Sequence, residues 1–133
     1  RRPVSPFVAD FVGETNFLKG RVAGTGDDGI TVEVSGGHRL LAQPGSTPVR
    51  EGDEVLLSVR PEAWKMGPWE KRFENALPGV IVESTYLGEL AQYRIETEGD
   101  VVKALELNPR LAHAEGRCLL RVDPADVVIL KEA

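Results

Sequence analysis

The chain has 133 residues, enough for one folded domain with a real core or for two very small domains that share one. Sixteen Lys and Arg against twenty-one Asp and Glu give a net charge of −5, which as a whole repels a nucleic-acid backbone. No apolar run reaches the roughly eighteen residues of a membrane span, and the N-terminus lacks the apolar core of a signal peptide. These features predict one soluble unit.

Residues 5–16 carry the only convincing helical signal. Ser5 can cap the start, Pro6 suits the first helical position and Gly13 suits the exit. The apolar residues recur at spacings of three and four, which places them on one face: Phe7, Val8, Phe11 and Val12. A helix of two turns cannot stand alone, so we expect this face to pack against this domain or a neighbouring one.

The rest of the chain predicts short strands, punctuated by 14 glycines and 9 prolines. Runs such as residues 30–34, in which apolar and polar residues alternate, predict strands with one buried face. The expected strands are 17–24, 30–35, 38–43, 54–60, 79–86, 90–97, 101–107, 117–122 and 127–130.

Two segments repeat, in the same order. Asn16, Leu18, Gly20 and Val22 match Asn75, Leu77, Gly79 and Ile81 at an offset of 75 − 16 = 59. Residues 55–61 match 118–124 at an offset of 63. The repeat predicts a mostly β fold, an OB-like barrel or sandwich made of two related β units, with a short N-terminal helix. We expect a linker and helix at 1–16, a first unit at 17–62, a connection at 63–74 and a second unit at 75–133.

No catalytic or metal-binding motif stands out in the sequence. The phosphate-binding pattern G-x-x-x-x-G-K-[ST] is absent, so we expect no ATP hydrolysis by this chain itself. His38 and His113 lie in different predicted units, without the spacing of zinc ligands. The single cysteine, Cys118, alternates with apolar neighbours and is expected to be a buried strand residue. The chain is therefore predicted to be non-enzymatic and without a cofactor or metal of its own.

The most unusual local composition is a surface aromatic–basic patch, predicted from Trp64, Trp69, Lys71 and Arg72. Aromatic side chains among cations on a β barrel are typical of single-strand nucleic-acid binders. We favour a connection whose aromatics pack inward while its charges stay solvated. A protein contact surface is the remaining alternative, since Trp and Arg are frequent anchors at interfaces.

The runs FVADFVGETNFLKGRV (7–22), REGDEVLLSVRPEAW (50–64) and TYLGELAQYRIET (85–97) together resemble one family. This family is the C-terminal TOBE (transport-associated OB) region of ATP-binding subunits of bacterial ABC importers. The spermidine/putrescine and iron(III) group is nearest, with sugar and sulfate importers related, so the resemblance implies uptake of a solute such as a polyamine, iron or a sugar by the parent protein. The resemblance covers nearly the whole chain. It implies that the nucleotide-binding domain, with ATP and Mg, precedes this region.

The resemblance also implies a role and partners. The region would act as a non-catalytic regulatory or dimerisation module, with its own ATPase domain, a second ATP-binding subunit and permease subunits as partners. It would lie at the cytoplasmic face of the inner membrane, held through the transporter complex without inserting into the bilayer, and no nucleic-acid partner is expected. The expected subunit or ATPase-domain contacts are Phe7, Phe11, Arg60 and Glu62, the last two from the family's R-P-E motif.

A ligand-sensing role is the alternative function. The strand that begins at Asn16 is similar to the start of small molybdate- and tungstate-binding Mop domains. The candidate residues for oxyanion or other small-ligand binding are Thr15, Lys19 and Arg21. The lead-in residues and the late strand depart from the Mop pattern, and the acidic Glu62 beside the expected site opposes an anion.

Overall fold

The computed structural model describes residues 14–45, 48–109 and 116–131. Its strands follow the predicted alternation, with the core residues of β1 and β2 lying every second position. The strands are β1 (Asn16–Gly26), β2 (Gly29–Val34), β3 (Arg39–Ala42), β4 (Glu54–Val59), β5 (Lys65–Pro68), β6 (Ala76–Leu87), β7 (Leu90–Thr97), β8 (Asp100–Leu107), β9 (Arg117–Arg121) and β10 (Val128–Lys131). Three short 3-10 turns are η1 (Ser35–Gly37), η2 (Pro61–Ala63) and η3 (Pro124–Asp126).

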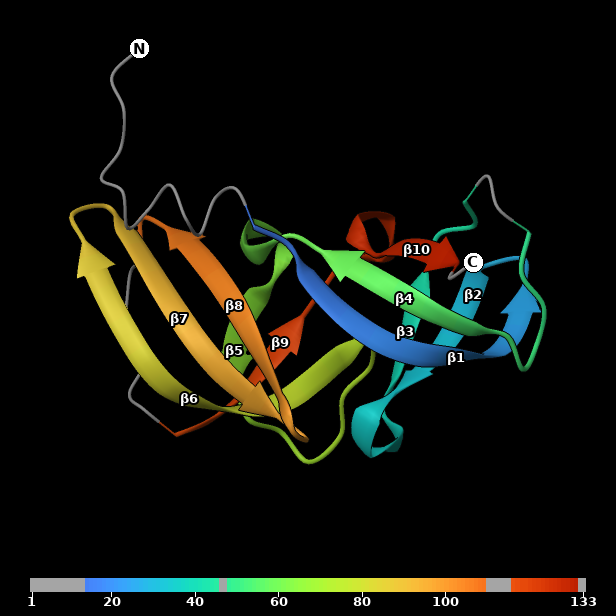
Figure 1. The fold of residues 1–133 in the computed structure, drawn as a ribbon. Coiled ribbons are helices and arrows are strands. Elements are labelled where there is room, and N and C mark those ends of the chain that lie inside the picture. The colour runs from blue at the N-terminus through green and yellow to red at the C-terminus, as the bar shows by residue number, and fades with distance from the viewer. Residues whose placement is uncertain (1–13, 46–47, 110–115, 132–133) are drawn as a thin grey trace, which may run out of the picture.

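The strands form two antiparallel five-stranded sheets that lie side by side (Figure 1). Their orders are β10-β4-β1-β2-β3 and β5-β9-β6-β7-β8. The prediction of a mostly β fold made of two related β units is confirmed. The described residues contain no α-helix. Residues 5–13 of the predicted helical segment, with Phe7 and Phe11, lie outside them, whereas residues 14–16 are described and are not helical, since Asn16 begins β1. Within the described ranges, no helix is long and apolar enough to cross a bilayer.

Each sheet is completed by a strand from the other half of the sequence. β10, from the C-terminal end, pairs with β4 in the first sheet, while β5 pairs with β9 in the second. The expected domain boundaries differ from this arrangement: residues 75–133 do not form one sheet, and the expected connection at 63–74 contains β5. The exchange removes one open edge from β4 and one from β9, because each gains a partner strand.

The predicted repeat extends to details of the two sheets. β1 has a register irregularity between Val22 and Gly24, and β6 has one between Ile81 and Glu83, at the same offset of 59. At these points the amide of Val22 donates to the carbonyl of Asp53, and that of Ile81 to the carbonyl of Gly116. The two halves are therefore related by an approximate twofold symmetry.

Two glycines allow neighbouring strands to approach closely. A Cβ on Gly20 would lie 2.5 Å from Cγ1 of Val32, and one on Gly79 would lie 2.5 Å from Cγ2 of Ile95. The core between the sheets is one continuous cluster, and its largest fully buried side chains include Leu40, Leu57, Tyr93 and Ile95. The continuous core makes the two halves one folding unit.

Candidate functional site

A pocket of about 390 Å³ lies beside η2 and η3, where the two halves meet. It is lined by Ser58, Arg60, Glu62, Ala63, Lys65, Ala125, Asp126 and Val128. The two 3-10 turns are symmetry-related, since Pro61 and Pro124 begin them at an offset of 63. The pocket, which we call the junction pocket, thus lies near the approximate twofold axis.

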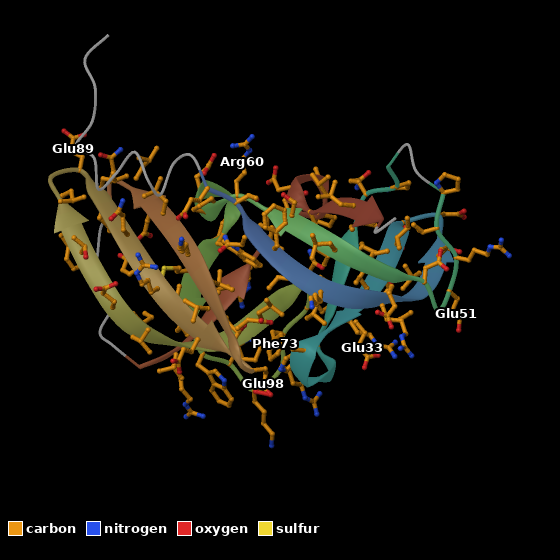
Figure 2. The ribbon with its side chains drawn as sticks, in the orientation of Figure 1. Glu33, Glu51, Arg60, Phe73, Glu89 and Glu98 are labelled. Atoms are coloured by element: carbon orange, nitrogen blue, oxygen red, sulfur yellow. The ribbon has the colours of Figure 1, made fainter. Side chains whose placement is uncertain are left out.

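The junction pocket has different walls on its two sides. The first half supplies Arg60, Glu62 and Lys65, whereas the equivalent positions in the second half are Asp123, Ala125 and Val128. The Asp123 side chain caps η3 by accepting a hydrogen bond from the amide of Ala125 at 2.9 Å. The equivalent turn η2 has no side-chain cap, so the Arg60 side chain makes no capping hydrogen bond. Figure 2 shows Arg60 projecting away from the ribbon at the edge of the molecule. Arg60 and Glu62 are both exposed and available for an external contact.

The three candidate ligand residues do not converge on one site. The Thr15 hydroxyl lies 2.9 Å from the Ser58 hydroxyl, at the border of the junction pocket, but is not among its lining residues. Lys19 and Arg21 are exposed on the outer face of β1. The Arg21 guanidinium donates to a Glu54 carboxylate at 3.2 Å, which offsets the positive charge that an oxyanion would need.

The prediction of a surface aromatic–basic patch is wrong for Trp64. Trp64 is only 3% exposed and belongs to the core, at the position equivalent to the buried Val127. It ends η2 and points inward because the chain turns there before β5 begins. Trp69 is 38% exposed, and Lys71 and Arg72 are also exposed, as predicted. A base-stacking surface built on both tryptophans is therefore not present.

Sequence reasoning missed the cation that contacts Trp69. The guanidinium carbon of Arg117, on β9, lies 4.1 Å from the Trp69 ring centroid, within the range of a cation–π interaction. Phe73, from the same connection, lies against His38 with ring centroids 6.0 Å apart. The connection thus lies along both sheets. No short-range signal could pair residues that are 117 − 69 = 48 positions apart.

Burial raises the pKa of two titratable groups in the core, Cys118 and Tyr93. Burial raises the pKa of the Cys118 thiol to about 11, so the thiol is neutral at physiological pH. Burial, followed by hydrogen bonds to Tyr86 and Glu106, raises the pKa of Tyr93, whose hydroxyl donates to Glu106 at 3.0 Å. Across the described ranges, no group of three or more His, Cys, Asp or Glu side chains could hold a metal ion.

This geometry defines a doubled all-β module in which each half supplies a strand to the other. The family model of the TOBE domain matches residues 57–130, more than half of the chain. The chain therefore belongs to the TOBE domain family.

Curated relatives support the same class. The chain is 33% identical over 114 residues to the spermidine/putrescine import ATP-binding protein PotA of Rubrobacter xylanophilus, covering 84% of this chain and 29% of that protein. It is 40% identical over 99 residues to PotA of Marinobacter nauticus, covering 73% of this chain and 26% of that protein. The homology is to the C-terminal region of these proteins. The chain spans less than a third of their length, and their ATP-binding domain is not present in it.

A solved structure shows the same fold at low identity. The cytoplasmic molybdate-binding protein ModG, crystallised with molybdate bound, superposes with a TM-score of 0.76 and 14% identity. The match covers 88% of this chain and 96% of that one. At this identity, the likeness defines the fold alone.

Proposed function

We propose that this chain is the non-catalytic C-terminal module of an ATP-binding subunit of a polyamine-type ABC importer, and that it helps two such subunits to associate. The observation that carries the proposal is the similarity to PotA proteins over 84% of the chain. The absence of a phosphate-binding motif anywhere in the sequence agrees with this role. ATP and Mg would bind in the preceding domain of the same subunit.

The proposed partners are that ATPase domain, a second ATP-binding subunit and the permease subunits. The module would act at the cytoplasmic face of the inner membrane, attached through the complex. Arg60 and Glu62, exposed beside the junction pocket, are suited to contact one of these partners. Phe7 and Phe11 remain proposed contacts to the ATPase domain.

The reading frame upstream of Arg1 in the natural gene tests the assignment. We expect a nucleotide-binding domain with a phosphate-binding loop within the preceding few hundred codons. Deleting the gene should abolish uptake of labelled spermidine or putrescine, and the intact gene should restore it. An upstream frame without a nucleotide-binding domain would contradict the proposal.

The junction pocket supports a second candidate function, the sensing of a small ligand. Its volume of about 390 Å³ and its four charged side chains could hold a small polar molecule. Calorimetry on this chain with molybdate, tungstate, spermidine and sugars separates the two functions. A module that acts only in assembly gives no heat of binding with any of them, whereas a sensor gives a saturable signal with one.

A further inference from the structure

The outer faces of the two sheets differ at symmetry-equivalent positions. On the first sheet, one row of paired residues runs across four neighbouring strands: Glu54, Arg21, Glu33 and Arg39. On the second sheet, the equivalent row is Arg117, Val80, Glu96 and Val101. Paired residues on neighbouring antiparallel strands share a face. The same four places of the fold thus carry two different surfaces.

The first row is neutralised within the chain. Arg21 pairs with Glu54 at 3.2 Å, and Arg39 with Glu33 at 3.5 Å. All four side chains are well exposed, and such a row is typical of a solvated surface. It offers neither free charge nor apolar area to a partner.

The second row, which we call the Val80 row, combines exposed apolar side chains with charges that are not paired within the row. Val80 is 44% exposed and Val101 is 54% exposed, and Trp69 extends the row through its contact with Arg117. Arg117 and Glu96 lie two strands apart, roughly 10 Å, with Val80 between them. Among the described residues they form no ion pair. Exposed apolar groups beside unpaired charges are characteristic of an interaction surface.

The order of chemistries in the Val80 row is self-complementary. It reads apolar, positive, apolar, negative, apolar: Trp69, Arg117, Val80, Glu96 and Val101. Consider two copies whose sheets face each other about a twofold axis that lies between them at Val80 and runs parallel to the strands. This axis reverses the order of the row, so each residue of one copy faces the residue at the opposite end of the row in the other copy. Val80 then meets Val80, and Arg117 of each copy meets Glu96 of the other. A twofold axis along the row would instead place Arg117 against Arg117, which like-charge repulsion disfavours.

We propose that the Val80 row is the face through which two copies of this chain associate. The inference rests on the proposed dimerisation role and names its surface. A hollow of about 280 Å³ beside Trp69 and Val80 can receive apolar side chains of the second copy. Figure 2 shows Glu98 at the lower end of β7 and β8, where it also lines this hollow. Within two longer chains that already associate, contact through this face would be strengthened, because the effective concentration of one face at the other is raised.

Sedimentation velocity of the chain at about 5 to about 500 µM tests the surface. We expect a concentration-dependent dimer that Arg117→Glu or Glu96→Arg weakens at least about tenfold, because each change creates two like-charge contacts. The double variant Arg117→Glu with Glu96→Arg restores the dimer, because the exchanged pattern is again self-complementary. Circular dichroism of each variant checks that the fold is kept.

Val80→Glu should also weaken the dimer at least about tenfold, since it places two carboxylates together at the axis. The matched control is Leu130→Glu, at an apolar residue of similar exposure on β10 of the first sheet, which should leave the dimer unchanged. A chain that stays monomeric, a double variant without rescue, or a dimer lost only with Leu130→Glu would overturn the inference. None of these outcomes removes the proposed function, which is tested separately by subunit association in the full-length protein.

Discussion

Asn16 and Asn75 hold the two halves together through equivalent hydrogen bonds. The Asn16 side-chain amide donates to the carbonyl of Val59 at 3.1 Å and to that of Lys103 at 2.8 Å. Its oxygen accepts from the amide of Lys103 at 2.8 Å. Asn75 donates to the carbonyl of Val122 at 2.6 Å and accepts from the amide of Leu41. Val59 and Val122 are equivalent at an offset of 63, so each asparagine bonds its own half and an edge strand of the other sheet.

Replacing either asparagine by alanine should destabilise the fold. Each change leaves backbone groups of an edge strand without a partner, at a cost of about 1 to 3 kcal/mol. Asn75→Ala should cost more, because Asn75 has a φ of 48° that alanine adopts less readily. Urea unfolding measures both effects. Gln43→Ala, at an exposed position in the loop after β3, is the control and should change stability by less than about 0.5 kcal/mol.

The two symmetry-related glycines predict a sterically driven loss of stability. Gly20→Ala and Gly79→Ala each place a methyl group 2.5 Å from a branched side chain of the neighbouring strand. We expect each to cost about 1 to 3 kcal/mol in urea unfolding, through overpacking. Gly24→Ala, in the same strand as Gly20 but with nothing within 4 Å, is the matched control. A loss as large at Gly24 as at Gly20 would show that the cost is not steric.

The buried thiol predicts a pH dependence at alkaline pH. Because burial raises the pKa of Cys118 to about 11, the folded state holds its proton where the unfolded chain releases it. Stability should therefore fall as pH rises above roughly 8.5, the usual cysteine pKa, and the loss should approach a limit near pH 11. Between pH 8.5 and 10.5, roughly, the wild-type chain should lose about 2 kcal/mol more than Cys118→Ala. Equal pH slopes for the two chains would contradict this assignment.

Arg60 provides a test of the junction pocket in the full-length ATP-binding subunit. Arg60 is exposed and does not cap η2, so Arg60→Ala should leave folding unchanged. It should weaken subunit association or reduce the ATP hydrolysis coupled to transport several-fold, because it removes a charged contact. Arg50→Ala, at another exposed arginine of the same half, is the control for loss of charge alone. Unchanged assembly and transport in Arg60→Ala would refute a contact role for this side chain.

Most strands could be predicted because alternation and turn residues act locally. The runs at 30–35, 54–60 and 90–97 appear within a residue or two of their expected bounds. β5 was missed because its residues, KMGP, do not alternate and include a glycine and a proline. The strand exists because Lys65 to Pro68 pair with β9, a contact that depends on residues fifty or more positions away.

The exchange of strands between the halves could not be predicted from the repeat. An edge strand needs the same local sequence whether it pairs within its own half or with the equivalent strand of the other half, as in a domain swap. The repeat predicted that Asn16 and Asn75 are equivalent, but not that their side chains bond opposite edge strands. The Val80 row was likewise hidden, because it is assembled from four strands and is distinctive only beside its charged counterpart on the first sheet.

The association of two full-length ATP-binding subunits in the presence of ATP, measured with and without residues 14–131, tests the proposed role most directly. If this region helps the subunits to associate, its removal raises the dimer dissociation constant at least about tenfold, or roughly 1.4 kcal/mol. Nucleotide binding to the isolated ATPase domain, measured in parallel, should be unchanged. A dissociation constant that is the same with and without the region would contradict the account.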